Sequence, residues 1–331
     1  MRKTILVTGA TGFLGNYIVK ELIEQGYRVA AIGRNVERGK ALEQQHCIFY
    51  PVDFTVKEQV QEVFKKEDID GVIHAGALSS AWGRWEDFYV VNVEGTRQVA
   101  ELALQYKVKR FVYISSPSVY TAKCDRFDVH EEEADQSNHL NHYIATKLMS
   151  ENILGGFCEK GLYVVILRPR GLIGRGDPSL MPRLMRANGK IGIPLFNGGG
   201  NIVDITCVEN AAYACYLALK AENVKGEVFN ITNDEPSRFR DVLEEFCQAA
   251  GEKANFRQLP FPLLYAAAEF MEWFYRLFNL KGEPVLTRYT VCTLAFSQTL
   301  NIDKAKEKLH YMPKKTLKEG IADYGKWWNS V

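Results

Sequence analysis

The most restrictive feature of the sequence is a run of closely spaced glycines between an apolar segment and an amphipathic one. Residues 4–7 are β-branched or apolar, as expected of a strand buried on both faces. Apolar residues then recur at helical spacing from Phe13 to Ile23, and Gly26 is placed to end that helix. The glycines therefore predict a strand-to-helix turn that holds a dinucleotide pyrophosphate, which we favour over a purely structural turn.

The turn brings several backbone groups toward that ligand. Glycine lets the backbone approach a phosphate closely, and the first turn of the helix offers unpaired N–H donors. The residues expected to contact the cofactor here are Gly9, Thr11, Gly12, Phe13, Leu14 and Gly15.

Composition narrows the choice of partners and compartment. The 331 residues include 41 basic and 40 acidic side chains, so nothing favours a nucleic-acid partner. The seven cysteines are scattered and form no Cys-x-x-Cys pair, which suits free thiols in a reducing cytosol better than disulfides or a metal site. The first strand follows residue 3, which leaves no room for a signal peptide. We expect a cytoplasmic protein with a small-molecule substrate, no metal and no transmembrane segment.

Strand patterns alternate with helical patterns along the first part of the chain. After the first strand, apolar runs occur at 28–32, 47–50, 71–77, 109–116 and 162–167. This alternation predicts an α/β fold, a doubly wound parallel sheet of the Rossmann type with its site at the carboxyl ends of the strands. Residues 121–141 are polar and acidic and are expected to form a surface excursion.

The alternation stops after Gly176 and returns only for 203–232. We therefore expect a dinucleotide-binding domain over 1–175, to which 203–232 returns. Residues 176–202 and 233–331 are expected to form a smaller, mostly helical substrate lobe that caps the crevice.

The end of the second strand bears on cofactor choice. An acidic residue there binds the ribose hydroxyls of NAD, whereas arginine favours the 2′-phosphate of NADP. Gly33 stands at that position, Arg34 follows, and Arg38 lies one turn further on. These residues favour NADP, with NAD as the alternative and two solvated arginines as the simpler interpretation.

A tyrosine and a lysine four residues apart indicate the chemistry. Tyr143 and Lys147 fall on one face of a predicted helix. Hydride transfer to a ketone builds negative charge on oxygen, which requires a proton donor and an oxyanion stabiliser. A neighbouring ammonium should lower the tyrosine pKa from about 10 toward neutrality. A serine at the end of strand 109–116 can donate to the same oxygen.

These motifs together resemble the extended branch of the short-chain dehydrogenase/reductase superfamily, the NAD(P)-dependent epimerase/dehydratases. The branch writes its glycine turn Thr-Gly-x-x-Gly-Phe-x-Gly, as here from Thr8. The resemblance implies that Tyr143 is the acid/base, that Lys147 activates it and holds the nicotinamide ribose, and that Ser116 polarises the carbonyl. Ser115 and Ser118 compete with Ser116 for that role, and Ser118 and Tyr143 are also expected to touch the substrate.

The resemblance assigns further residues around the cofactor. Asp53 would contact adenine, although it could also be the N-cap of the helix that begins near Lys57. Asn92 would organise the site by hydrogen bonding, and a buried, satisfied asparagine is the equal alternative. His74 taken alone would be a core histidine. The full set of additional expected residues is Asp53, Phe54, His74, Ala75, Gly76, Asn92, Pro169 and Ile173.

Two departures from the family pattern concern the substrate. Enzymes of this branch that act on nucleotide sugars carry an asparagine and an arginine that grip the diphosphate, but Gly171 and Val203 stand at those positions. The stretch 201–210 and Leu309-His310-Tyr311-Met312-Pro313 instead resemble the 3β-hydroxysteroid dehydrogenase-like group. That resemblance implies interconversion of a secondary alcohol and a ketone on a sterol-like or 3-keto acyl substrate. A nucleotide-sugar epimerase/dehydratase and a non-catalytic NADP-binding regulator are the alternatives.

One helix of the second lobe has an unusual composition. Residues 262–278 are apolar or aromatic except for Glu269, Glu272 and Arg276 on one face. We expect this helix to pack on the core or against a second copy in a homodimer. The alternatives are a wall for an apolar substrate and shallow, peripheral contact with a membrane.

Overall fold

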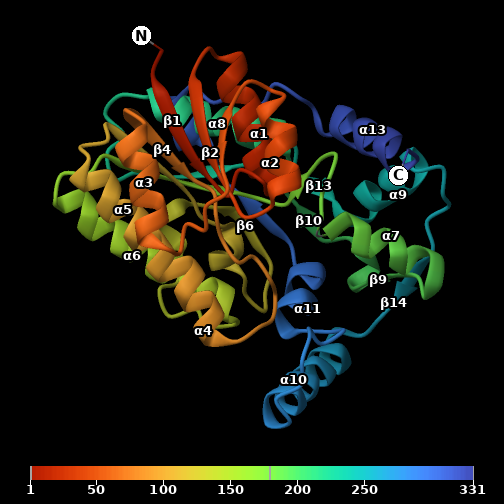
Figure 1. Cartoon of the computed structure of the whole chain (residues 1–331). Coiled ribbons are helices and arrows are strands. Elements are labelled where there is room, and N and C mark those ends of the chain that lie inside the picture. The colour runs from red at the N-terminus through yellow and green to blue at the C-terminus, as the bar shows by residue number, and fades with distance from the viewer. Residues whose placement is uncertain (1, 179, 331) are drawn as a thin grey trace.

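The computed structural model of the chain describes residues 2–178 and 180–330. Its central layer is a seven-stranded parallel sheet in the order β12-β7-β5-β4-β1-β2-β3 (Figure 1). The strands are β1 (Thr4–Thr8), β2 (Arg28–Ile32), β3 (Ile48–Tyr50), β4 (Ile69–His74), β5 (Arg110–Ile114), β7 (Val164–Pro169) and β12 (Val228–Ile231). The central strands are apolar and buried because helices cover both faces. The predicted doubly wound sheet is confirmed.

Two helical layers enclose this sheet. One packs around α1 (Phe13–Glu24), α8 (Val208–Lys220) and α12 (Asp303–Leu309), and the other around α3 (Lys57–Lys66), α5 (Gly95–Gln105) and α6 (His142–Glu159). Two short helices, α2 (Val36–Glu43) and α4 (Trp85–Phe88), complete this part. Because β1 pairs with both β2 and β4, the strand order reverses beside β1. Ligands of open α/β sheets bind at such a reversal.

The segment expected to be a surface excursion is partly buried. It contains β6 (Arg126–Val129), which pairs with β15 (Gln298–Leu300). Glu131 is buried, and its carboxylate accepts a hydrogen bond of 2.8 Å from the backbone N–H of Asn230. The expectation is therefore wrong for Val129 and Glu131, which strand pairing and the bond to Asn230 draw into the molecule, while Phe127, Asp128 and His130 are exposed as expected.

The second lobe has its own apolar core. It is formed by α7 (Leu180–Lys190), β9 (Ile193–Leu195), α9 (Phe239–Ala249), β14 (Phe256–Gln258), α10 (Phe261–Leu277), α11 (Arg288–Ala295) and α13 (Leu317–Trp328). Short strand pairs join the lobes: β8 (Leu172–Ile173) with β11 (Thr206–Cys207), and β10 (Ile202–Val203) with β13 (Ser237–Arg238) and β15. Ile302, Leu309 and Tyr311 pack in the first core instead. The division into domains stays a prediction. By this packing, residues 302–311 would belong with the dinucleotide-binding domain and not with the second lobe.

Helix α10 lies at the periphery, beyond α11 (Figure 1). Its first half packs on the second core, through Phe261, Leu264, Tyr265 and Ala268. Beyond this point a polar residue is turned inward: Glu272 is buried and accepts hydrogen bonds from the backbone N–H and Nε of Arg288, at 2.7 and 2.9 Å. The apolar residues Leu263, Phe270, Trp273, Phe274, Leu277 and Phe278 are exposed. Packing on the core is therefore wrong for all but the first turns.

Candidate active site

The glycine turn lies where the strand order reverses. A Cβ on Gly9 would stand 2.7 Å from Cα of Gly76, which follows β4, and Gly9 has φ +66°. The backbone N–H of Gly76 donates to Oγ1 of Thr8, at 3.2 Å. The ends of β1 and β4 are thus in direct contact, and a side chain at Gly9 would separate them.

The start of α1 leaves backbone donors available. Gly12 is the N-cap residue and gives no side-chain cap, and among the described residues the N–H groups of Phe13, Leu14 and Gly15 have no acceptor. A Cβ on Gly15 would meet the carbonyl oxygen of Gly9 at 2.1 Å, so only glycine permits this close turn. An uncapped helix start with free donors fits the pyrophosphate of a dinucleotide.

The end of β2 places an arginine beside Asp53. Nη1 of Arg34 lies 3.7 Å from Oδ2 of Asp53, and the Arg34 side chain is 74% exposed. Oδ1 of Asp53 accepts hydrogen bonds from the backbone and hydroxyl of Thr55, at 3.0 and 2.8 Å, and is not the cap of α3. A Cβ on Gly33 would lie 2.5 Å from Oγ1 of Thr11. An acid at position 33 would therefore displace Thr11 from the turn.

His74 is enclosed beneath the site. Its Nδ1 lies 2.6 Å from the Thr8 hydroxyl and its Nε2 lies 3.0 Å from the Thr96 hydroxyl, and the side chain is fully buried. Burial, with the nearby charge of Lys147, lowers the pKa of His74 to about 3, so the ring is neutral. Contact of a cofactor with the backbone of His74, and with Ala75 and Gly76 beyond it, stays a prediction.

Phe54 fills the space under the strand that ends at His74. A Cβ on Gly76 would meet the Phe54 ring at 2.5 Å, and the Phe54 and His74 rings contact edge to face with centroids 5.2 Å apart. Phe54 therefore supports the loop after β4 from below, and its expected contact with the cofactor stays a prediction.

Asn92 ties three parts of the site together. Its Oδ1 accepts from the backbone N–H of Leu78 at 2.8 Å, and its Nδ2 donates to the carbonyl of Leu78 and the hydroxyl of Thr146, at 3.1 and 3.0 Å. Asn92 lies in a π-helical turn, Tyr89–Glu94, between α4 and α5. Such turns recur at functional sites because they redirect side chains. Asn92 is fully satisfied, and through these bonds it fixes the loop after β4 against α6.

The hydroxyl groups of the three serines after β5 meet different partners. Ser115 donates to Glu151, away from the turn. The Ser116 hydroxyl donates to Oγ of Ser118 at 3.0 Å and lies close enough to Tyr143 to act on the pKa of its phenol. Ser118 lies 2.7 Å from the hydroxyl of Tyr289 on α11. The structure therefore brings Ser116 to Tyr143, while Ser115 faces another group.

Burial sets the protonation of Tyr143 and Lys147. Burial raises the pKa of Tyr143, and the nearby Ser116 hydroxyl opposes this only in part. Nζ of Lys147 lies 5.9 Å from the centre of the Tyr143 ring and donates to the carbonyl of Ile114 and the hydroxyl of Tyr113, at 2.7 and 3.1 Å. Burial lowers the pKa of Lys147 to about 7. The expected lowering of the tyrosine pKa is thus wrong for the chain without ligand.

The loop after β7 closes the site from the side of the second lobe. Pro169 is the last residue of β7, and Ile173 is buried in β8, which pairs with β11. The sequence reasoning gave no role to the side chain of Arg170 in this loop or to Tyr289. Nothing in the sequence near Tyr289 marks it, because the second lobe alone brings it to Ser118.

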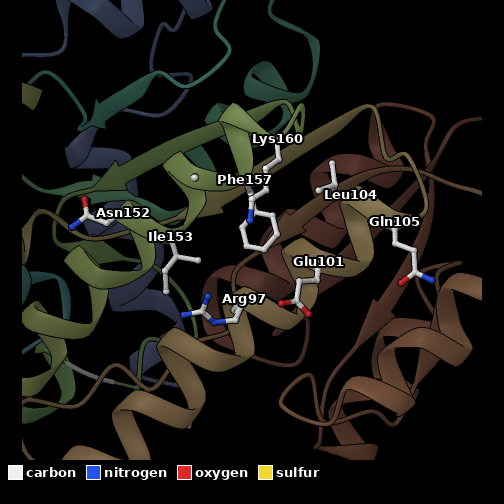
Figure 2. Close-up of a pocket in the computed structure, with 9 residues that line it drawn as sticks. Arg97, Glu101, Leu104, Gln105, Asn152, Ile153, Phe157 and Lys160 are labelled. Atoms are coloured by element: carbon white, nitrogen blue, oxygen red, sulfur yellow. The ribbon is translucent and has the colours of Figure 1, made fainter.

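A separate groove lies on the outer faces of α5 and α6 (Figure 2). Its volume is about 500 Å³. It includes none of the residues around Tyr143. The residues that line it are Arg97, Glu101, Leu104, Gln105, Asn152, Ile153, Gly156, Phe157 and Lys160.

The arrangement defines a class of protein, a nucleotide-binding α/β fold with a serine, a tyrosine and a lysine beside the glycine turn. Residues 5–232 match the model of the NAD dependent epimerase/dehydratase family. The chain belongs to this family, in its 3β-hydroxysteroid dehydrogenase-like branch, and is an NAD(P)-dependent enzyme of the dehydrogenase/reductase type.

Relatives extend over nearly the whole chain. An uncharacterised Escherichia coli protein, YbjS, is 35% identical, over 98% of this chain and 97% of its own length. A 2-alkyl-3-oxoalkanoate reductase of Shewanella oneidensis is 30% identical, over 95% and 84%. A decarboxylating sterol-4-alpha-carboxylate 3-dehydrogenase of Schizosaccharomyces pombe is 32% identical, over 96% and 95%.

Solved structures share the fold. The UDP-glucuronic acid 4-epimerase of Bacillus cereus, in complex with NAD, aligns with a TM-score of 0.78 at 22% identity, over 99% of this chain and 97% of that one. This likeness supports the architecture alone. Among residues 2–178 and 180–330, the structure has no helix both long and apolar enough to cross a bilayer.

Proposed function

We propose that the enzyme interconverts a secondary alcohol and a ketone on a hydrophobic substrate of the 3-oxo acyl or sterol type, with NADP as preferred cofactor. The observation that carries this proposal is the closeness of Ser116 and Lys147 to Tyr143 at the carboxyl end of β5, where the Lys147 ammonium lies 5.9 Å from the centre of the Tyr143 ring. The names of the relatives support it, since they describe a reductase of 3-oxoalkanoates and a sterol 3-dehydrogenase.

The chain's own groups supply the acid and the oxyanion contact. The raised pKa keeps Tyr143 protonated at neutral pH, so its phenol can donate a proton to a ketone oxygen. Ser116 donates a hydrogen bond to that oxygen and stabilises its developing charge. Lys147 holds Tyr113 and the end of β5, which fixes the distance between strand and helix. The nicotinamide cofactor, when bound, supplies or accepts the hydride.

The nucleotide-sugar alternative finds no support in this site. Val203, at the position of the diphosphate-binding arginine, is buried in the second core. Gly171 has φ +53°, and a Cβ there would come within 3.2 Å of the carbonyl oxygen of Asp204. The regulator alternative is disfavoured because Ser116, Tyr143 and Lys147 are all retained and assembled.

The first prediction concerns Tyr143. The variant Tyr143→Phe keeps the ring and loses the proton donor, so we expect kcat to fall about 100-fold or more. Turnover is followed at 340 nm with NADPH and a panel of 3-oxo acyl compounds, 3-oxosteroids and UDP-sugars. Cofactor binding, measured by fluorescence, should not change. Undiminished activity of Tyr143→Phe would refute the assignment, and tight binding of UDP-sugars alone would overturn the substrate class.

The second prediction concerns cofactor preference. Arg34 is exposed and held only by a long ion pair, so it is free to meet a 2′-phosphate. We expect Arg34→Ala to raise the KM for NADPH about 10-fold and to leave the KM for NADH unchanged. The matched control is Arg84→Ala, a similarly exposed arginine on a different loop. Equal effects of Arg34→Ala on both cofactors would contradict selection by this side chain.

A further inference from the structure

Arg170 is a buried arginine whose guanidinium meets no hydrogen-bond or ion-pair partner in the part of the chain that the structure describes. It follows β7, where its backbone N–H donates to the carbonyl of Ile231 at 2.9 Å and its carbonyl accepts from the hydroxyl of Thr206. The residue is 8% exposed. Among the described residues its guanidinium forms no hydrogen bond and no ion pair, and its Nε is enclosed without an acceptor. A buried, unpaired charge is unfavourable, so this guanidinium is suited to an anionic ligand.

The neighbours of Arg170 do not neutralise it. Asp204 interacts with it electrostatically but lies beyond ion-pair distance, and its carboxylate accepts from the backbone N–H of Leu300 at 2.7 Å. Burial raises the pKa of Asp204 to about 6, which weakens it further as a counter-ion. Arg126, which lines the same small cavity as Arg170, is paired with Glu133 at 2.8 Å. The remaining ionisable groups that face Arg170 or this cavity are Tyr120, Cys124, Tyr289 and Cys292.

A chain of hydroxyl groups leads from the site of reaction toward Arg170. Ser116, which lies near Tyr143, is 3.0 Å from Ser118, and Oγ of Ser118 is 2.7 Å from the hydroxyl of Tyr289. Tyr289 in turn interacts electrostatically with Arg170. Ser118 and Tyr289 are therefore placed between the Arg170 guanidinium and the hydroxyls proposed to bind the ketone oxygen.

We propose that Arg170, together with Tyr289 and Ser118, binds the free carboxylate of the substrate and so selects 3-oxo and 3-hydroxy carboxylic acids over neutral ketones and alcohols. A guanidinium matches a carboxylate in charge and in planar, two-pronged geometry. In a 3-oxo acid one carbon separates the ketone from the carboxylate, so both groups must be recognised within a short span. The inference rests on the proposed function, because it takes Ser116 and Tyr143 as the site of the ketone oxygen.

The test compares an acid with its neutral ester. A 2-alkyl-3-hydroxyalkanoate and its methyl ester are oxidised with NADP+, and kcat/KM is followed at 340 nm. We expect the wild-type enzyme to favour the acid strongly. Arg170→Met should lower kcat/KM for the acid about 100-fold and change that for the ester less than about threefold. Arg170→Lys should recover part of the loss, since it keeps a point charge. Arg126→Met, the matched control, should leave the ratio of acid to ester unchanged.

The outcomes separate this inference from the proposed function. Equal losses on acid and ester, or a wild-type enzyme that does not distinguish them, would overturn the role of Arg170. If the wild-type enzyme oxidises neither compound, the proposed function fails, and the carboxylate site is tested by binding of the 3-hydroxy acid to the NADP+ complex, read by tryptophan fluorescence. Binding lost in Arg170→Met supports the site, and unchanged binding overturns it. The melting temperature of Arg170→Met should not fall, because the native side chain has no partner to lose.

Discussion

Helices α6 and α10 both bury charged residues, but these residues have different roles in the two helices. Helix α6 buries Lys147 and Glu151 against the sheet, and Glu151 is paired with Arg168 at 2.6 Å. Helix α10 buries Glu272 and leaves Phe270 and Trp273, 63% and 54% exposed, in solvent. In α6 the buried charges surround the residues proposed for catalysis. In α10 the single buried carboxylate attaches the helix to α11. Buried polar groups thus specify position in both helices, but buried residues run along most of α6, whereas only the first half of α10 packs on an apolar core.

The ion pair of α6 should give the largest effect. Arg168→Met leaves the Glu151 carboxylate buried without its partner and removes bonds to Tyr120 and to the carbonyl of Glu131. We expect the free energy of unfolding to fall by about 3–5 kcal/mol, measured by urea denaturation. Arg183→Met, which breaks an exposed pair with Glu283, should cost less than about 1 kcal/mol. Similar losses in the two variants would show that burial does not distinguish these pairs.

Lys147 should give an intermediate effect that depends on pH. Its pKa is about 7 in the folded chain and about 10.4 when unfolded. Between these values the unfolded chain binds a proton that the folded chain lacks, so stability rises with pH in this window and not below pH 7. From pH 7 to 9 the cofactor-free wild type should gain about 2 kcal/mol relative to Lys147→Met. Parallel pH profiles for the two proteins would mean that the amine keeps an ordinary pKa.

The outer face of α10 should give the smallest effect. Phe270→Ser and Trp273→Ser remove side chains that are exposed, so each should change the free energy of unfolding by less than about 0.5 kcal/mol. The buried control Phe196→Ala, in the second core, should cost about 3–5 kcal/mol. A large loss at Trp273 would mean that this face is covered in solution. Sedimentation with and without lipid vesicles then separates the predicted homodimer from the predicted membrane contact.

Local patterns in the sequence were enough for the sheet and for placing Tyr143 and Lys147 one turn apart on a single helix. A buried parallel strand needs a short apolar run, and a residue four positions along a helix shares a face, so neither depends on distant parts of the chain. The constraint on Gly15 is equally local, since a side chain there would meet the backbone of Gly9, whereas the constraint on Gly9 comes from the distant Gly76.

Tertiary structure decided what distant segments bring to the site. Ser116 is distinguished from Ser115 only by which of them meets Tyr143 and which meets Glu151. Arg170 becomes a candidate receptor because α11 and β7 enclose it without supplying an acceptor, and the direction of α10 depends on Glu272 finding Arg288. Sequence periodicity describes which residues share a face. Long-range contacts decide which part of the molecule that face packs against, because burial and hydrogen bonding depend on neighbours that are far apart along the chain.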